Sequence, residues 1–228
     1  MSDLKTSLLS WANEYKVLQR EYFLDKEANK FTERYGRLQV LEGTIIELCE
    51  KIGAEYPPIN PFQGWKDPDA DTRSPLDGRW SLRFTTAADA TFKPNEKLGN
   101  AATSQRVCAE TGYFINEIDF DGTGTSKVKG FRVFVEGKPR KDEENVVDLK
   151  FRKVQILRDS RFPKLFGSIS LRIPTISSLS ALSALFRISS GVAAKRPSKK
   201  IVFVDDDMRI HKSSEGKWFV QSKLANRI

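Results

Sequence analysis

The first 55 residues repeat their apolar side chains at alternating spacings of four and three, which is the period of an amphipathic helix. One apolar stripe runs from Leu4 to Tyr22 and a second from Phe31 to Ile52, with Gly53 as a stop signal. The polar stretch at residues 25–30 predicts a turn between two antiparallel helices. Such stripes could also pack against the helix of a partner protein in a coiled coil. Two short stripes more often pack on each other or on the main domain, and we expect that arrangement.

From Arg79 onward the apolar period changes to two, which indicates half-buried β-strands. Trp80, Leu82 and Phe84 alternate with polar neighbours in the first of these strands. A change of phase near Val154 predicts a β-bulge within a long strand. Further strands are predicted at residues 113–120, 128–135, 147–156, 169–173, 201–204, 208–211 and 217–221.

Eight or nine strands without recurring crossover helices favour an antiparallel sandwich or barrel, and therefore a mainly β fold. Five prolines within residues 56–78 predict a linker, which Phe62 and Trp65 would pin to the domain surface. We therefore expect a helical segment at 1–55, a proline-rich linker at 56–78 and a β domain at 79–228.

The net charge of +8 is distributed unevenly along the chain. Residues 1–149 carry 21 basic and 25 acidic side chains, whereas residues 150–228 carry 17 basic and 5 acidic ones. Within residues 150–204 there are 12 basic side chains and one acid, Asp159. This segment suggests a polyanionic partner: nucleic acid, an anionic membrane or an acidic protein surface.

Residues 176–190 place apolar side chains on one side of a short helix that would be inserted late in the β domain. An apolar stripe beside basic residues is typical of a membrane-surface element, although a lid helix packed on the barrel would show the same stripe. Nucleic acid is less favoured, because no nucleic-acid motif accompanies the basic residues. The docking candidates are Leu179, Leu182, Leu185, Phe186, Lys195, Arg196, Lys199 and Lys200.

Several classes of protein are disfavoured by the scarcity of reactive side chains. Cys49 and Cys108 are two isolated thiols, and His211 is the only histidine, so a two-histidine zinc site within one chain is impossible. The longest uncharged run, residues 173–186, has 14 residues and is too short to span a bilayer as a helix. The N-terminus has neither an apolar signal region nor a transit-peptide composition, which suggests a cytosolic protein or a processed form.

Five segments carry a family resemblance. The sequence SPLDGRWSLRFTT at residues 74–86 contains the glycine–x–tryptophan of lipocalins and resembles the opening of the plastid lipid-associated proteins, the plastoglobule fibrillins. The sequence VDDDMRI at 204–210 resembles the acidic and arginine element of that family, and GKWFV at 216–220 is similar to its closing strand. Residues 116–120 and 147–154 are similar to its middle strands.

The resemblance implies a lipocalin-like barrel in a plastid, peripheral on the thylakoid or plastoglobule, in a chain without its transit peptide. It also implies a lipophilic ligand such as a carotenoid, a quinone or an acyl lipid, and no established catalysis. In lipocalins an arginine from a late strand packs across the tryptophan ring, and Arg209 has that position relative to Trp80. Asp207 and Arg209 match the polar pair of the family. Asp207 would contact the ligand, satisfy a turn or pair with Arg209, whereas Arg209 is expected mainly to brace Trp80.

Three hypotheses follow. The first is a binding module whose barrel interior is lined by Trp80, Leu82, Phe84, Phe114, Phe134, Phe151, Phe203, Asp207, Arg209 and Trp218. The second is a structural subunit or assembly factor of a photosynthetic membrane complex, with a filled barrel. The third is an enzyme or chromophore-attachment factor of lipid, quinone or pigment metabolism that uses Cys49 or Cys108; buried packing is the favoured role of both cysteines. No metal site is expected, because within Asp205, Asp206 and Asp207 only the first and third share a strand face, and no histidine or further acid stands at a suitable spacing.

Overall fold

The computed structural model describes all residues except 25–30, 88–96, 160–166, 173–196 and 226–228. Two long helices, α1 (Ser2–Leu24) and α2 (Phe31–Glu55), precede the strands. The strands are β1 (Gly78–Thr85), β2 (Ala101–Cys108), β3 (Tyr113–Phe120), β4 (Val128–Pro139), β5 (Val146–Arg158), β6 (Ser168–Arg172), β7 (Ser198–Val204), β8 (Met208–Ser213) and β9 (Trp218–Lys223). The short helix predicted at 176–190 lies outside the described residues.

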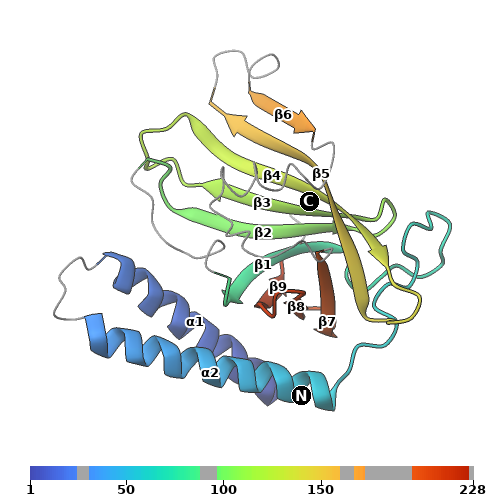
Figure 1. Ribbon diagram of the computed structural model, residues 1–228, viewed down its shortest axis with the longest axis horizontal. Coiled ribbons are helices and arrows are strands. Elements are labelled where there is room, and N and C mark those ends of the chain that lie inside the picture. The colour runs from blue at the N-terminus through green and yellow to red at the C-terminus, as the bar shows by residue number, and fades with distance from the viewer. Residues whose placement is uncertain (25–30, 88–96, 160–166, 173–196, 226–228) are drawn as a thin grey trace.

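The strands form one antiparallel sheet that closes on itself, which confirms the mainly β, lipocalin-like barrel (Figure 1). Their order is β4-β3-β2-β1-β9-β8-β7-β5-β6, and a pairing of β4 with β5 closes the ring. β5 pairs with β4 along one edge, and on its other edge residues 146–148 pair with β7 and residues 153–157 pair with β6. β6 therefore extends the sheet beyond the closed ring.

The phase change near Val154 is a β-bulge, as predicted. Phe134 of β4 lies opposite Lys153, and Val135 lies opposite Phe151, so Arg152 is the extra residue in β5. The bulge places Phe151 and Val154 in the same apolar cluster although they are three residues apart.

The helical pair packs against the barrel, which confirms the expected arrangement over a coiled coil with a partner (Figure 1). Leu8, Ile45 and Ile52 are fully buried in one cluster with apolar residues of β1 and β7–β9. The rings of Tyr15 in α1 and Phe84 in β1 meet edge to face, with centroids 5.0 Å apart. α2 approaches β7 so closely at Gly53 that an added Cβ would lie 2.3 Å from a methyl carbon of Val202.

The proline-rich stretch is held against the strands by two aromatic side chains, as the sequence predicts. Phe62 is buried in a second apolar cluster with Trp80 and Phe114. The indole N–H of Trp65 donates a hydrogen bond to the carbonyl of Gly137 over 3.1 Å. Gly137 has no alternative at this position, because an added Cβ would come within 3 Å of the Phe114 and Trp65 rings.

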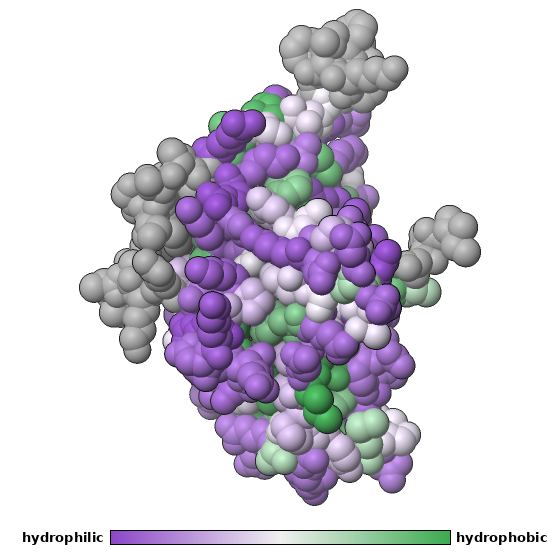
Figure 2. All heavy atoms as spheres, turned by 90° about the vertical axis from the view of Figure 1, so that its right-hand side faces the viewer, coloured by the Kyte–Doolittle hydropathy of each residue, from purple (hydrophilic) through white to green (hydrophobic). Residues whose placement is uncertain are grey.

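The outer surface around this stretch is mostly hydrophilic, with only small hydrophobic areas (Figure 2). Neither α1 nor α2, the two helices that the structure describes, is long and apolar enough to cross a bilayer.

Candidate functional site

The barrel interior combines apolar and polar side chains. Its apolar part is the cluster around Trp80 and Phe114, which are fully enclosed. Its polar part contains Arg209 and the side chains that contact it. Alternation along the antiparallel strands brings these residues to one face, because Trp80 lies opposite Gln105 in β2 and Arg209 lies opposite Gln221 in β9.

Arg209 is the centre of the polar part. Its guanidinium carbon lies 4.9 Å from the centre of the Trp80 ring, so the predicted cation–π contact is confirmed. Nε donates to Oε1 of Gln221 over 3.0 Å, and one terminal nitrogen donates to Oε1 of Gln105 over 2.9 Å. Burial lowers the pKa of Arg209 to about 9. These contacts give Arg209 the structural role that the sequence favours.

Lys199 points its ammonium into the same interior. Nζ donates to Oε1 of Gln105 over 3.2 Å and lies 4.9 Å above the ring of Phe114. Enclosure of the ammonium, and then the charge of Arg209, lower the pKa of Lys199 well below its ordinary value. The structure therefore corrects the prediction of a docking role for Lys199, because alternation along β7 exposes Lys200 and turns Lys199 inward.

His211 lies on the interior face of β8, two residues after Arg209. Its ring stacks on Phe219 with centroids 4.7 Å apart and an interplanar angle of 5°. Nδ1 is buried and is the one enclosed side-chain N or O atom of the described residues without a hydrogen-bond partner. Burial, followed by the charges of Lys199 and Arg209, lowers the pKa of His211 well below its usual range, so the imidazole is neutral.

The expected interior residues divide between two clusters. Trp80, Phe114 and Phe151 lie together in the barrel, and Leu82 is buried opposite Gln221. Three other expected lining residues pack instead in the cluster formed with the helices: Phe84, Phe203 and Trp218.

Phe134 lies apart from both clusters. It alternates with the buried Val133 and Val135, so its ring is on the outer face of β4. The ammonium of Lys153 lies 4.0 Å above this ring. The structure therefore places Phe134 away from Trp80 and Arg209.

Asp207 lies at the barrel surface rather than in the interior. Its side chain is 72% exposed and pairs with Lys5 of α1, which also bonds Asp205 over 2.7 Å. Asp205 satisfies the turn before β8, because its Oδ1 accepts hydrogen bonds from the backbone N–H groups of Asp207 and Met208. The two aspartates thus anchor α1 to the barrel, and no contact joins Asp207 to Arg209.

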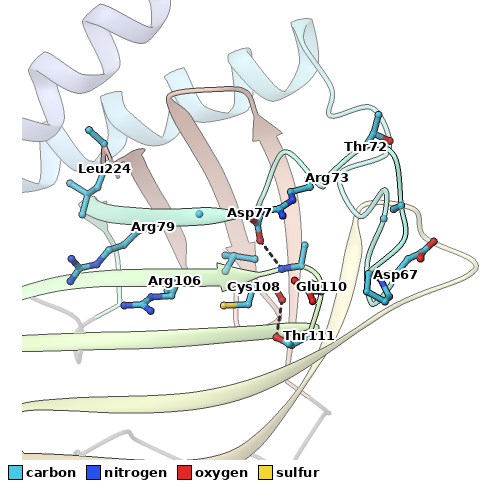
Figure 3. Close-up of a pocket in the computed structure, with 17 residues that line it drawn as sticks. Asp67, Thr72, Arg73, Asp77, Arg79, Arg106, Cys108, Glu110, Thr111 and Leu224 are labelled. Atoms are coloured by element: carbon cyan, nitrogen blue, oxygen red, sulfur yellow. Dashed lines mark hydrogen bonds and ion pairs between the residues drawn. The ribbon is translucent and has the colours of Figure 1, made fainter. Parts of the chain in front are cut away.

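A groove of about 850 Å³ lies outside the barrel, between the proline-rich stretch, β1 and β2 (Figure 3). Arg79 and Arg106 line it, and both also contact the buried carboxylate of Glu117, at 2.6 and 3.1 Å. Figure 3 shows Asp77 bonded to the backbone N–H of Ala109, at 2.8 Å. Both arginines that line the groove are therefore already paired with a carboxylate.

The two thiols are protonated at neutral pH. Cys49 of α2 is fully buried in the cluster between the helices and the barrel, and burial raises its pKa to about 12. Cys108 is part exposed beside the groove, and burial and Asp77 raise its pKa as well. Neither environment activates a nucleophile. Within the part of the chain that the structure describes, no three metal-ligating side chains gather.

Most of the predicted docking residues lie outside the described part of the chain: Leu179, Leu182, Leu185, Phe186, Lys195 and Arg196. Lys200 is exposed on β7 and lies directly opposite Lys212 of β8.

Comparison with known proteins agrees with this architecture. The PAP_fibrillin family model matches residues 58–222, which include all nine strands except the last residue of β9. A search of curated proteins found no match.

Proposed function

Because the chain belongs to the PAP_fibrillin family of plastid lipid-associated proteins, we propose that its barrel binds a lipophilic ligand and that its basic face holds it on a membrane. The observation that carries the first part is the interior itself. It joins the aromatic surfaces of Trp80 and Phe114 to buried hydrogen-bonding groups, a combination typical of ligand sites. A carotenoid, a quinone or an acyl lipid would supply the matching apolar surface.

The second part rests on lysines of the late strands, of which Lys200 and Lys217 are exposed and Lys212 is half-buried. Lys200 and Lys212 face each other across β7 and β8, and Lys217 is exposed in the following hairpin. Lysines near an anionic membrane contribute on the order of 1 kcal/mol each at low salt. We propose that this surface keeps the protein peripheral on the thylakoid or plastoglobule.

Ligand binding is tested by extracting the purified native protein with organic solvent and analysing the extract by mass spectrometry. One molecule of a pigment, quinone or lipid per chain supports the proposal. An empty extract, together with no binding of these classes in titrations that follow tryptophan fluorescence, would overturn it.

Membrane docking is tested with two charge-matched triple variants. Lys200→Ala, Lys212→Ala and Lys217→Ala together should weaken binding to vesicles that contain anionic lipid, by about 100-fold at low salt. The control combines Lys127→Ala, Lys138→Ala and Lys141→Ala, which remove the same charge from β4 and the segments that flank it. Equal loss in both variants, or binding that ignores salt, would contradict a specific docking face.

A second candidate function is a structural subunit or assembly factor of a photosynthetic membrane complex. The fully buried side chains of Trp80, Phe114 and Arg209, which occupy part of the interior, favour it. The same extraction separates the two candidates, because an assembly factor with a filled barrel would copurify with protein partners and no ligand. The protonated thiols of Cys49 and Cys108 give no support to the enzymatic alternative.

A further inference from the structure

Among the residues that the structure describes, the barrel interior holds two cations without a matching anion. Neither Lys199 nor Arg209 forms an ion pair with any carboxylate of the described residues. The chain also contains no acidic side chain at all between Asp159 and Asp205. The oxygen shared by the two cations is the neutral amide oxygen of Gln105, at 3.2 Å from Lys199 and 2.9 Å from Arg209.

This arrangement is unusual for a protein interior. Buried charges are normally paired or bound to a ligand, because an isolated charge loses its hydration. The lowered pKa of Lys199 has this origin, since burial and Arg209 both act against the ammonium. A third cation, Lys223, lies 5.1 Å from the Trp80 ring and adds to the positive potential.

His211 supplies a second, independent observation. Its Nδ1 is buried and lacks a partner, on a residue that is 2% exposed. It shares the interior face of β8 with Arg209, and its pairing partner Ile201 is two residues from Lys199. The unsatisfied nitrogen therefore borders the same positive region.

We propose that the ligand held by the barrel is an acyl lipid with a free carboxylate, and that this carboxylate binds between Lys199 and Arg209, next to His211. This inference rests on the proposed lipid-binding function and adds the class of ligand and its orientation. The carboxylate would replace the missing counter-ion, and the acyl chain would lie along the apolar side chains around Phe114. A carboxylate suits the site better than a phosphate, because one negative charge offsets a lysine with a lowered pKa and an arginine that is already bonded to two glutamines.

The test measures the affinity of the full chain, freed of lipid, for palmitate and for methyl palmitate. The two ligands differ in charge at the end group and have the same acyl chain. We expect palmitate to bind at least tenfold more tightly than the ester. Lys199→Met should reduce this preference to less than threefold by lowering the affinity for palmitate. Lys200→Met, the matched control on the outer face of the same strand, should leave both affinities unchanged.

Four results would count against the inference. Equal affinity of the wild type for acid and ester would refute the anionic end group but leave lipid binding in place. A preference that survives Lys199→Met would refute the assigned site. Tighter binding of a lysophosphatidic acid of equal chain length would refute the choice of carboxylate. Absence of binding to either palmitate or its ester would count against both the inference and the proposed function. The melting temperature of each variant verifies that it is folded.

Discussion

Replacing Lys199 by methionine should stabilise the ligand-free protein, although the change removes visible contacts. Methionine has nearly the same length and keeps the packing against Phe114. It removes the ammonium that is enclosed beside Arg209 without a counter-ion. Gln105 keeps a partner, because its Oε1 still accepts the hydrogen bond from Arg209.

The expected magnitude is a balance of three contributions. The charged hydrogen bond to Gln105, at 3.2 Å, is worth about 1.5–3 kcal/mol. The cation–π contact with Phe114 adds about 0.5–1 kcal/mol. Against these stands the penalty for burying an unpaired ion, which is several kcal/mol. The balance favours Lys199→Met by about 1–2 kcal/mol, which corresponds to a melting temperature about 2–8 °C higher for a chain of this size.

The pH dependence identifies the cause. Because the folded-state pKa of Lys199 is lowered, the unfolded chain binds the proton more tightly between that value and the ordinary value of 10.5. The wild type therefore gains stability as the pH rises through this window, and the methionine variant lacks this gain. Chemical denaturation at pH 7 and pH 10 should show the gap between the two proteins closing. A variant that is less stable by 1 kcal/mol at pH 7, or a gap independent of pH, would refute the reasoning.

Three further predictions concern the rest of the fold. Ile45→Ala should destabilise the protein by about 2–4 kcal/mol, because it opens a cavity where α2 meets the barrel, and a loss under 1 kcal/mol in urea denaturation would contradict this packing. Glu117→Gln should lower the free energy of unfolding by about 2–3 kcal/mol. This is less than the loss of a fully buried ion pair, because the guanidinium groups of Arg79 and Arg106 are half exposed and can hydrate. An unchanged urea midpoint would contradict the pairing. In the native protein a maleimide should label Cys108 slowly and Cys49 only after unfolding, so rapid native labelling of Cys49 would show that the helical pair opens.

The strands could be predicted from the sequence, because alternation of apolar and polar side chains is a local pattern, and it identifies eight of them. The contact of Arg209 with Trp80 was implied by the resemblance to lipocalins rather than by any local pattern. β2 is not predicted from the sequence, because its side chains are mostly small or polar and show no apolar alternation. Its strand conformation depends on pairing with β1 and β3.

The composition of the interior could not be predicted, because two strands change phase within their length. Register shifts occur between Leu82 and Phe84 and between Ile201 and Phe203. Each shift turns the aromatic residue that follows it, Phe84 or Phe203, toward the helices. Simple alternation along the strand therefore assigns these two side chains to the barrel interior, which is the wrong face. Lys199 was misassigned for a related reason, since in sequence it is one of two adjacent lysines and only the closed barrel distinguishes inside from outside.

The way in which β5 closes the ring has a mechanical consequence. β4 pairs with β5 along nearly its whole length. Among the described residues, the ladder between β7 and β5 covers residues 146–148 of β5 and is flanked by backbone hydrogen bonds at Asn145 and Leu149. This pairing is the shortest ladder between neighbouring strands of the ring, so the barrel wall would open there with the fewest broken backbone hydrogen bonds. Amide hydrogen exchange should therefore be fastest there among the ring strands. Lys199 is itself paired with Val147 in this short ladder. Binding of an anion by Lys199 would therefore also stabilise the short pairing of β7 with β5, so that ligand binding and closure of the barrel wall would be coupled.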